Sequence, residues 1–477
     1  MRNAAPHPRP ALEEALAAAR ETRALVLGAG VVTETGALFA RHFPGAHAVV
    51  VADPDTNALA GEAVRAALDR AGVRQERPYL FAERSPHAEI AVVERLAEAL
   101  RGHAAVPVAV GSGTINDLVK LAAHRTGRES YLCVATAASM DGYTAYGASI
   151  TAAGAKQTFA CPAPRVVVAD LAVIGRAPPE RTAAGYADLL AKVTAGADWI
   201  LADALGVEPI DPRAWGIVQG GLREAVADPA GARAGEPGAL GRLVEGLMLG
   251  GLAMQWAQTS RPASGAEHQF SHLWDMEGHT HRGEAPAHGF KVGVATVAVA
   301  QLYEALLATD LERLDPAAAA RAWAEGGQPD EATLRAQFAG TGFVETVVTE
   351  TRAKAAGGSE VRAQLERLRG VWPELRARLQ AQLLPAEELR RRLRLAGAPV
   401  EPEEIGLSRE RLRASFRRAG LIRRRFTVLD VALRAGLLEP LLETLFGAGG
   451  PWDLHAPAPP DVAPPKGRPP PPPPATP

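Results

Sequence analysis

A short stretch of the chain, residues 268–288, carries five of the 12 histidines in the sequence. They are His268, His272, His279, His281 and His288. His268 and His272 are four residues apart in a segment typical of a helix start, so they share one helical face. Two histidines and one carboxylate that leave coordination positions open commonly hold a catalytic divalent metal. The spacing alone also fits a pair of surface histidines that binds no metal.

Asp188 is the candidate carboxylate for such a site. It lies among apolar residues in the segment 185–192, which predicts that its side chain is buried. A buried carboxylate needs a partner, and a metal ion would supply one. The residues therefore suggest a metal site formed by Asp188 and histidines of the 268–288 stretch.

A glycine-rich turn, GSGTIND at residues 111–117, follows an apolar run and leads into a predicted helix. Gly111 and Gly113 would let the backbone approach a phosphate, and the first N–H groups of the helix would point at it. This arrangement suits the pyrophosphate of a dinucleotide. The pattern is not GxGxxG, and a simple tight turn would look similar.

Two other positions near predicted strand ends also suggest nucleotide binding. Gly28 and Gly30 form a second glycine pair, but the spacing to Asp53 makes it a weaker candidate than the turn at residues 111–117. Asp53 follows an apolar run and would either bond a ribose hydroxyl or cap the next helix.

Short apolar runs alternate with amphipathic segments in the first part of the chain. Apolar residues at three- and four-residue spacing predict helices, and the short apolar runs between them predict strands. The predicted strands are 24–27, 47–52, 105–110, 131–135 and 165–169, and the predicted helices are 11–22, 56–71, 87–101 and 115–125. Such alternation is typical of βαβ units, so we expect an α/β domain with a mostly parallel sheet.

The pattern changes near residue 175, where two prolines interrupt the chain and strand signals nearly vanish. We therefore predict three parts: an α/β nucleotide-binding domain at 1–175, an all-α domain at 176–450, and a proline-rich tail at 451–477. The tail cannot donate backbone hydrogen bonds along its proline run and is expected to be disordered.

Composition narrows the class of protein further. The formal net charge is -2, which gives no general attraction to nucleic acid. No run reaches the ~18 uninterrupted apolar residues needed to cross a membrane, so we expect no membrane insertion. The two cysteines, Cys133 and Cys161, lie in apolar runs, are expected to be core residues, and suit a reducing cytoplasm.

Taken together, the ordered motifs resemble those of the sn-glycerol-1-phosphate dehydrogenases. This family belongs to the superfamily of iron-type alcohol dehydrogenases, glycerol dehydrogenase and dehydroquinate synthase. The matching stretches are VVADPDT at 50–56, GSGTIND at 111–117, TAASMDGY at 136–143, GYAD at 185–188, SGAEH at 264–268 and HG at 288–289. The resemblance extends from about residue 25 to residue 445, and it implies a dehydroquinate synthase-like fold.

The resemblance also implies roles for individual residues. Asp188, His268 and His288 would bind one divalent metal, usually Zn²⁺, with Fe²⁺ or Ni²⁺ as alternatives. Asp141, Asp188 and His272 would face the substrate. NAD or NADP would be held by Asp53 and Gly111 and by Gly113, Thr114, Ile115, Asn116, Asp117, Thr136, Ala137, Ala138 and Ser139.

The sequence departs from the family pattern at three places. Ala145 replaces a serine that often touches the cofactor, Ala187 replaces a glycine before the metal-binding aspartate, and the His-rich insertion 278–282 lies between the two histidine ligands. We interpret His279 and His281, within this insertion, as loop residues.

The function implied by the resemblance is the metal-dependent, NAD(P)-linked interconversion of dihydroxyacetone phosphate and sn-glycerol 1-phosphate. Lys156 and Lys192 are candidate phosphate contacts, although each could equally be a surface charge or an ion-pair partner. The alternatives are a glycerol or other polyol dehydrogenase, a dehydroquinate synthase-like cyclase, and a catalytically dead scaffold. A small phosphorylated triose is the expected partner, and a homo-oligomer is possible.

Overall fold

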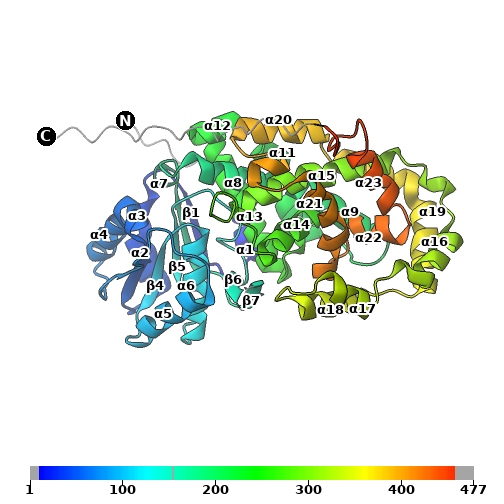
Figure 1. The fold of residues 1–477 in the computed structure, drawn as a ribbon. Helices are drawn as coiled ribbons and strands as arrows, with labels where there is room; N and C mark the ends of the chain where they lie inside the picture. The colour runs from blue at the N-terminus through cyan, green and yellow to red at the C-terminus, as the bar shows by residue number, and fades with distance from the viewer. Residues whose placement is uncertain (1–9, 153–154, 457–477) are drawn as a thin grey trace.

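The computed structural model describes residues 10–152 and 155–456 of the chain. Figure 1 shows an N-terminal part with a central sheet on one side and a larger, helical part on the other. The predicted fold class is confirmed, because strands of the central sheet and their helices come first and helices follow.

The central sheet has six strands, all parallel, in the order β1-β8-β5-β4-β2-β3. The strands are β1 (Ala24–Gly28), β2 (Ala48–Ala52), β3 (Tyr79–Leu80), β4 (Val106–Gly111), β5 (Leu132–Ala135) and β8 (Val166–Asp170). Every residue of β2, β5 and β8 is buried. Such continuous valine-rich strands are expected where helices cover both faces of a parallel sheet.

The four predicted helices of this part are found near their predicted positions, as α1 (Pro10–Ala18), α3 (Pro54–Thr56) with α4 (Glu62–Arg70), α5 (Ile90–Arg101) and α6 (Gly113–Arg125). Helices α2 (Thr35–His42) and α7 (Leu171–Ile174) were not predicted. The first helix ends at Ala18 rather than at residue 22. Thr22 instead donates its hydroxyl to Pro164 O and its N–H to the side chain of Gln255, which anchors the chain before β1.

A two-stranded antiparallel hairpin, β6 (Ala148–Ala152) and β7 (Ala155–Phe159), was not predicted. It lies outside the central sheet, and β7 contacts helix α14 (Ala266–Met276) of the helical part. The hairpin therefore brings residues of the N-terminal part to the helix that carries His268 and His272.

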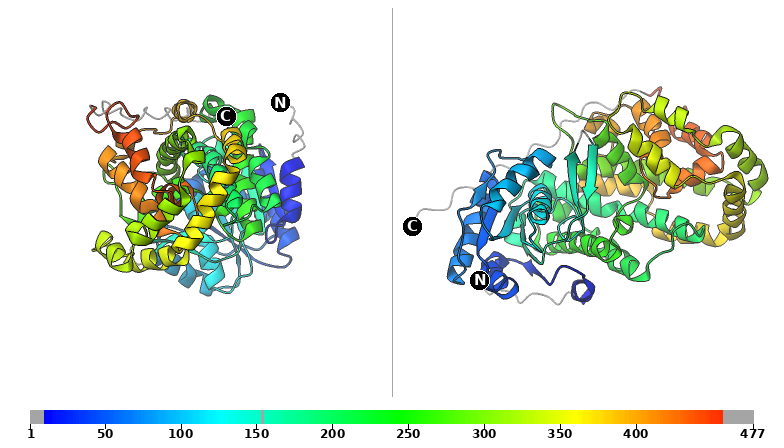
Figure 2. Two further views of the ribbon diagram at one scale, coloured as in Figure 1. Left: turned by 90° about the vertical axis from the view of Figure 1, so that its right-hand side faces the viewer. Right: turned by 90° about the horizontal axis from the view of Figure 1, so that it is seen from below.

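The helical part is built around two long helices, α13 (Pro237–Ala257) and α15 (His288–Ala308). Its other long helices are α8 (Pro179–Leu190), α9 (Lys192–Ala204) and α19 (Gly358–Gln382). Figure 2 shows the helical part and the sheet from two further sides. The remaining helices are α10 (Pro212–Gln219), α11 (Leu222–Ala225), α12 (Pro229–Ala234), α14, α16 (Pro316–Ala322), α17 (Glu331–Gln337), α18 (Val344–Ala353), α20 (Ala386–Ala396), α21 (Arg409–Arg418), α22 (Val428–Arg434) and α23 (Leu438–Phe446).

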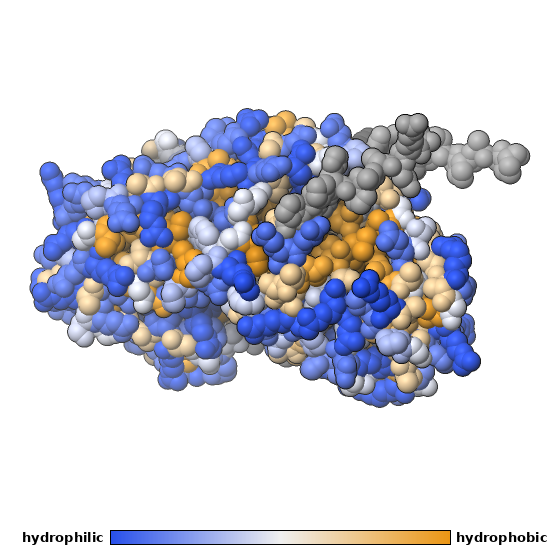
Figure 3. Space-filling model, turned by 180° about the vertical axis from the view of Figure 1, so that it is seen from behind, coloured by the Kyte–Doolittle hydropathy of each residue, from blue (hydrophilic) through white to orange (hydrophobic). Residues whose placement is uncertain are grey.

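Helix α15 is, among the described residues, the one helix long and apolar enough to cross a membrane. In its most apolar window, 78% of the residues are buried inside the protein, as in a core helix. It packs against α8, α14 and α20. Figure 3 shows that hydrophobic residues form only separate areas among hydrophilic ones on the rear face.

The end of the described chain packs on the helical body. The Trp452 side chain is fully buried, and its ring lies 4.5 Å from the guanidinium carbon of Arg390. The backbone N–H of Trp452 donates to Leu445 O. For residues 451–456 the structure therefore differs from the expected disordered tail, because one large aromatic side chain is enough to anchor them. The rest of the predicted tail, residues 457–477, lies outside the described residues.

Candidate metal centre

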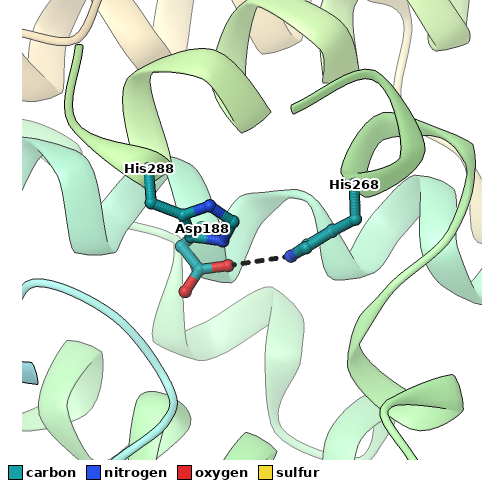
Figure 4. Close-up of side chains that lie close together, drawn as sticks. All are labelled: Asp188, His268 and His288. Atoms are coloured by element: carbon teal, nitrogen blue, oxygen red, sulfur yellow. Dashed lines mark ion pairs between the residues drawn. The ribbon is translucent and has the colours of Figure 1, made fainter. Parts of the chain in front are cut away.

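Asp188, His268 and His288 come together although 100 residues of chain separate the first from the last. Asp188 lies on α8, His268 on α14, and His288 begins α15. One ligand atom from each lies within 4.8 Å of the other two, and Nε2 of His268 is 3.4 Å from Oδ1 of Asp188. Figure 4 shows the three side chains converging on one point. This is the spacing that a single bound ion would bridge.

Two glycines let the elements of the site approach closely. A Cβ on Gly289 would lie 1.9 Å from the carbonyl oxygen of Ala184, so α15 could not begin where it does against α8. A Cβ on Gly185 would lie 2.0 Å from the carbonyl oxygen of Ala138. Because the obstacles are backbone atoms, a side chain at either position would displace a whole element.

The neighbours of the two histidines orient their rings. Nδ1 of His268 donates to Oε1 of Glu267 at 2.8 Å, which leaves Nε2 facing Asp188. Glu267 is fully buried and also accepts a hydrogen bond from the hydroxyl of Thr194. Ser271 Oγ lies 3.3 Å from Nδ1 of His288. Contacts of this kind fix the ring orientation of metal-binding histidines.

The electrostatics of the three residues suit a divalent cation. Burial lowers the pKa of His288 to about 3, so its ring is a neutral nitrogen donor at neutral pH. Burial opposes ionisation of Asp188, but Lys192 and the two histidines outweigh it and lower the pKa of this carboxyl. One carboxylate and two imidazoles form a donor set that fits Zn²⁺ and other first-row divalent metals.

Lys192 is buried beside this site and pairs with both of its aspartates. Its Nζ lies 2.8 Å from Oδ1 of Asp188 and 2.7 Å from Oδ2 of Asp141, and its side chain is fully buried. The backbone N–H of Asp141 donates to Oδ2 of Asp188. Burial, followed by repulsion from Asp188, raises the pKa of Asp141. Of the three alternatives for Lys192, the structure shows the ion-pair partner.

His272 lies next to the three candidate ligands but is not part of the group whose ligand atoms lie within 4.8 Å of one another. Its ring centre is 6.0 Å from that of His288 and 6.3 Å from that of His268. Its Nδ1 is buried and has no hydrogen-bond partner among the described residues. Burial, and then the charge of Arg423, hold the pKa of His272 well below its usual range. A neutral imidazole with a free nitrogen is available to a bound molecule.

The glycine-rich turn lies at the carboxyl end of β4, and α6 begins at Gly113. A Cβ on Gly113 would come within 2.7 Å of Met140, and one on Gly111 within 2.5 Å of Ile115. Thr136 donates its N–H to Gly111 O, which places the 136–139 segment beside the turn. The predicted cofactor residues of both segments are therefore neighbours.

Two side chains of the predicted cofactor set have hydrogen-bond partners inside the protein, and a third is buried in the core. Asn116 accepts from the hydroxyl of Tyr131, Asp117 accepts from the N–H of Ser149 in the hairpin, and Ile115 is buried. The part of this segment that can meet a phosphate is the backbone at the start of α6.

Asp53 caps the helix that follows β2. Its Oδ1 accepts from the N–H of Thr56 at 2.7 Å, and the Thr56 hydroxyl is the partner of the Asp53 N–H at 3.1 Å. Of the two alternatives for Asp53, the capping one is found in the structure. The ribose contact stays a prediction.

The residues of the His-rich insertion are loop residues, as predicted. His279 is nevertheless buried, with Nε2 2.7 Å from Ile405 O and Nδ1 2.9 Å from Arg411. His281 pairs through its backbone with Glu284. Cys133 and Cys161 are both free and buried, as expected for core residues. Ala145 is buried with Met254 and Ala263.

A separate pocket of about 1020 Å³ opens where α8 and α15 begin. Pro179, Ala287 and Phe290 line one side of it, and Arg233 and Leu395 are also part of its wall. None of the three candidate ligands lines this pocket, and the described residues hold no further cluster of metal-binding side chains there. We therefore place the chemistry at Asp188, His268 and His288.

Sequence reasoning missed one residue that organises the site and left the role of another open. Glu267 orients His268, and its signal was its place directly before a candidate ligand in a predicted helix. Lys192 bridges Asp141 and Asp188, and its signal was the four-residue spacing from Asp188, which places both side chains on one helical face.

Comparison with known proteins agrees with this geometry. A family model described as iron-containing alcohol dehydrogenase matches residues 26–178. The glycerol-1-phosphate dehydrogenase (NAD(P)+) of Pyrococcus furiosus is 33% identical over 283 residues, which are 59% of this chain and 78% of the relative. The chain belongs to the glycerol-1-phosphate dehydrogenase family.

Two further matches describe the breadth of this similarity. The glycerol-1-phosphate dehydrogenase of Halalkalibacterium halodurans is 36% identical over 261 residues, and the match spans 54% of this chain and 65% of the relative. A probable glycerol dehydrogenase from Sinorhizobium meliloti shares the fold, with a TM-score of 0.54 and 18% identity over 88% of this chain and 96% of that structure. The resemblance seen in the sequence motifs is thereby confirmed.

Proposed function

We propose that the chain is a metal-dependent, NAD(P)-linked dehydrogenase that interconverts dihydroxyacetone phosphate and sn-glycerol 1-phosphate. The observation that carries this proposal is the convergence of Asp188, His268 and His288 beside a histidine with a free ring nitrogen. The relatives that bear the name glycerol-1-phosphate dehydrogenase support the choice of substrate. Residues 1–175 would bind the cofactor, and residues 176–450 would supply the metal ligands.

In the proposed reaction Asp188, His268 and His288 hold the metal, for which we propose Zn²⁺, with Fe²⁺ or Ni²⁺ suited to the same donors. When bound, the metal would supply Lewis-acid chemistry at the carbonyl oxygen and the nicotinamide would supply the hydride. Glu267 keeps Nε2 of His268 directed at the site by accepting from Nδ1. Asp188 contributes the one negative charge of the set.

The residues around the ligands position the substrate. His272 is neutral and has a free Nδ1, so it is suited to orient a hydroxyl or to relay a proton between the substrate oxygen and solvent. Lys192 holds the carboxylate of Asp141 in place beside Asp188. The pyrophosphate of the cofactor would lie at the start of α6, against Gly111, Gly113 and the 136–139 segment.

An activity screen with metal analysis of the same sample tests the proposal. The enzyme is assayed with NADH and with NADPH against dihydroxyacetone phosphate and dihydroxyacetone. We expect net oxidation of the reduced cofactor, a bound divalent metal and a higher kcat/KM for the phosphorylated ketone. A preference for free dihydroxyacetone would instead indicate a polyol dehydrogenase. Absence of net cofactor turnover with either ketone would contradict the proposed oxidoreductase.

A further inference from the structure

We propose that Asp198 is a positioning residue of the metal centre, because its buried carboxylate joins the helices that carry the candidate ligands. The inference rests on the proposed function, since it assigns a supporting role within the same metal site. Asp198 lies on α9, and its side chain is fully buried. A single residue, Ala191, separates α9 from α8, the helix of Asp188.

The carboxylate of Asp198 accepts hydrogen bonds from three other helices. Its Oδ2 accepts from the N–H of Ala266 at 2.7 Å, at the start of α14. Its Oδ1 accepts from the hydroxyl of Tyr303 on α15 at 2.6 Å. The same oxygen accepts from the N–H of Val428 at 2.8 Å, at the start of α22. One side chain thus connects α9 to both helices that carry the histidine ligands.

A carboxylate suits these donors better than a neutral side chain does. The first N–H groups of a helix have no partner within the helix and carry partial positive charge. Asp198 satisfies such groups in α14 and in α22 at once. Within residues 10–152 and 155–456 no lysine or arginine forms an ion pair with this carboxylate, and Arg261 donates to the backbone O of Asp198 instead. The two helix starts therefore supply the positive charge that the carboxylate needs.

Glu267 connects this arrangement to His268. Its Oε1 accepts from the N–H of Gly265 at 2.6 Å and from Nδ1 of His268 at 2.8 Å. Its Oε2 accepts from the hydroxyl of Thr194 at 2.9 Å. Thr194 precedes Asp198 by four residues on α9, so the two side chains lie on one helical face. Helix α9 therefore holds the first turn of α14 through one side chain and the ring-orienting carboxylate through the other.

Gly265 shows how closely the two carboxylates enclose the start of α14. A Cβ at this position would lie 2.6 Å from Oδ2 of Asp198, 2.9 Å from Oε2 of Glu267 and 2.8 Å from the Cα of Ala195. Burial, and then repulsion from Glu267, raise the pKa of Asp198 to about 7, and the three hydrogen bonds limit that rise. Two buried carboxylates side by side are costly unless hydrogen bonds compensate them. The start of α14 supplies such bonds to both.

A positioning role differs in its consequences from a purely structural one. Asp198 forms no hydrogen bond with any of the three candidate ligands, so its effect on the metal must pass through the helices that carry them. Loss of a residue that supports a metal ligand typically costs 10- to 100-fold in metal affinity. A purely structural role predicts lower stability with unchanged metal affinity. Positioning predicts weaker metal binding and a changed coordination geometry in a folded protein.

The test measures the Kd for Zn²⁺ of the full chain in competition with a chromogenic chelator. The variants are Asp198→Asn, Tyr303→Phe and Thr194→Val. The last two each remove a single hydroxyl hydrogen bond with little change of shape. We expect the Kd to rise roughly 10- to 100-fold in each variant. If Asp198→Asn does not fold, the other two variants decide the proposal.

Matched controls remove buried hydroxyl hydrogen bonds of the same kind away from the metal centre. Tyr131→Phe deletes the bond to Asn116, and Thr351→Val deletes the bond to Leu421 O. Both should bind Zn²⁺ with the Kd of the wild type. A second measurement is the visible absorption spectrum of the Co²⁺-loaded protein, which reports the coordination geometry. The spectrum should change in Asp198→Asn and Thr194→Val and should stay the same in the controls.

The outcomes separate the positioning role from the function. If the variants unfold more readily but keep the Kd for Zn²⁺ and the Co²⁺ spectrum of the wild type, Asp198 is only structural and the assignment is wrong. If the wild type binds Zn²⁺ but does not reduce dihydroxyacetone phosphate, the proposed function fails, and the Kd values of the variants still decide the positioning role. A wild type that binds no divalent metal would overturn both.

Discussion

The ammonium group of Lys192 lies 2.8 Å from Oδ1 of Asp188, and both side chains are fully buried. The same Nζ lies 2.7 Å from Asp141, so one cation stabilises two carboxylates in the interior. Removing one partner of a buried ion pair leaves an uncompensated charge, which typically costs about 3–5 kcal/mol. The cation is therefore needed for the metal-binding residues to fold into their arrangement.

Lys192→Met should lower the free energy of unfolding of the metal-free protein by about 3–5 kcal/mol in urea denaturation. The matched control is Arg362→Met, which removes an exposed ion pair with Glu366 and should cost less than about 1 kcal/mol. An unchanged unfolding midpoint in Lys192→Met would show that the pair contributes nothing.

Gly289→Ala should disrupt the junction of α8 and α15. The new Cβ would stand 1.9 Å from the carbonyl oxygen of Ala184, which belongs to the backbone of α8 and cannot move aside alone. We expect a loss of about 1–3 kcal/mol in stability, as for overpacking, together with weaker metal binding.

The control for this variant is Gly216→Ala in helix α10, where a Cβ meets nothing within 4 Å. It should be neutral or stabilising by up to about 1 kcal/mol, since alanine is the better helix former. Thermal unfolding and metal analysis of both variants make the comparison. If Gly289→Ala and Gly216→Ala have the same Tm and the same metal content, the close approach of α8 and α15 is not required for stability or metal binding.

The metal-free protein should lose stability as the pH falls below about 6.5. Burial lowers the pKa of His288 from its ordinary 6.5 to about 3, so between these values the unfolded chain binds a proton that the folded chain does not. The contribution of His288 to the free energy of unfolding is therefore present above pH 6.5 and is lost as the pH falls toward about 3. The lowered pKa of His272 also makes the folded protein less stable on acidification. The raised pKa of His268 has the opposite effect on stability.

The measurement is the Tm of metal-free protein between pH 7 and pH 5, the window given by the His288 pKa. His288→Gln should reduce the drop in Tm over this range, whereas His124→Gln, at an exposed position on α6, should leave it unchanged. A drop of the same size in wild type and His288→Gln would assign the acid sensitivity to other groups.

Trp452→Ala should destabilise the protein by about 3–5 kcal/mol, the usual cost of deleting a large buried aromatic side chain. Trp452 is fully buried, and its ring stacks with Arg390 of α20. Leu395→Ala, at a side chain on the same helix that is 40% exposed, should cost much less. If chemical denaturation finds Trp452→Ala as stable as the wild type, the end of the described chain does not support the body.

The parallel sheet could be predicted because its strands have a local signal in the sequence, whereas the three candidate ligands were implied by the resemblance of the motifs to a known family. The valine-rich runs of β2, β4 and β8 are continuous, and His268 and His288 stand at helix starts in the structure as in the pattern. The hairpin of β6 and β7 has no such signal. Its pattern is half polar, and its position depends on contacts with α14 that lie far away in the chain.

The supporting residues were harder to predict, because their roles depend on tertiary neighbours. The sequence allows Lys192 to be a phosphate contact, a surface charge or an ion-pair partner, and its pairing depends on Asp141, which comes from another part of the chain. Asp53, by contrast, was ambiguous because a helix cap and a ribose contact require the same residue at the same place.

The most direct test of the metal centre is the metal content of His268→Ala and His272→Ala, purified and loaded in parallel. Both residues lie on α14, but only His268 is placed with Asp188 and His288 within bridging distance of one ion. We predict that His268→Ala is metal-depleted and inactive, since a site with two ligands binds a divalent cation much more weakly. His272→Ala should retain a full complement of metal and lose about 10²-fold or more in turnover. Metal loss in His272→Ala with retention in His268→Ala would contradict the assignment of the ligands.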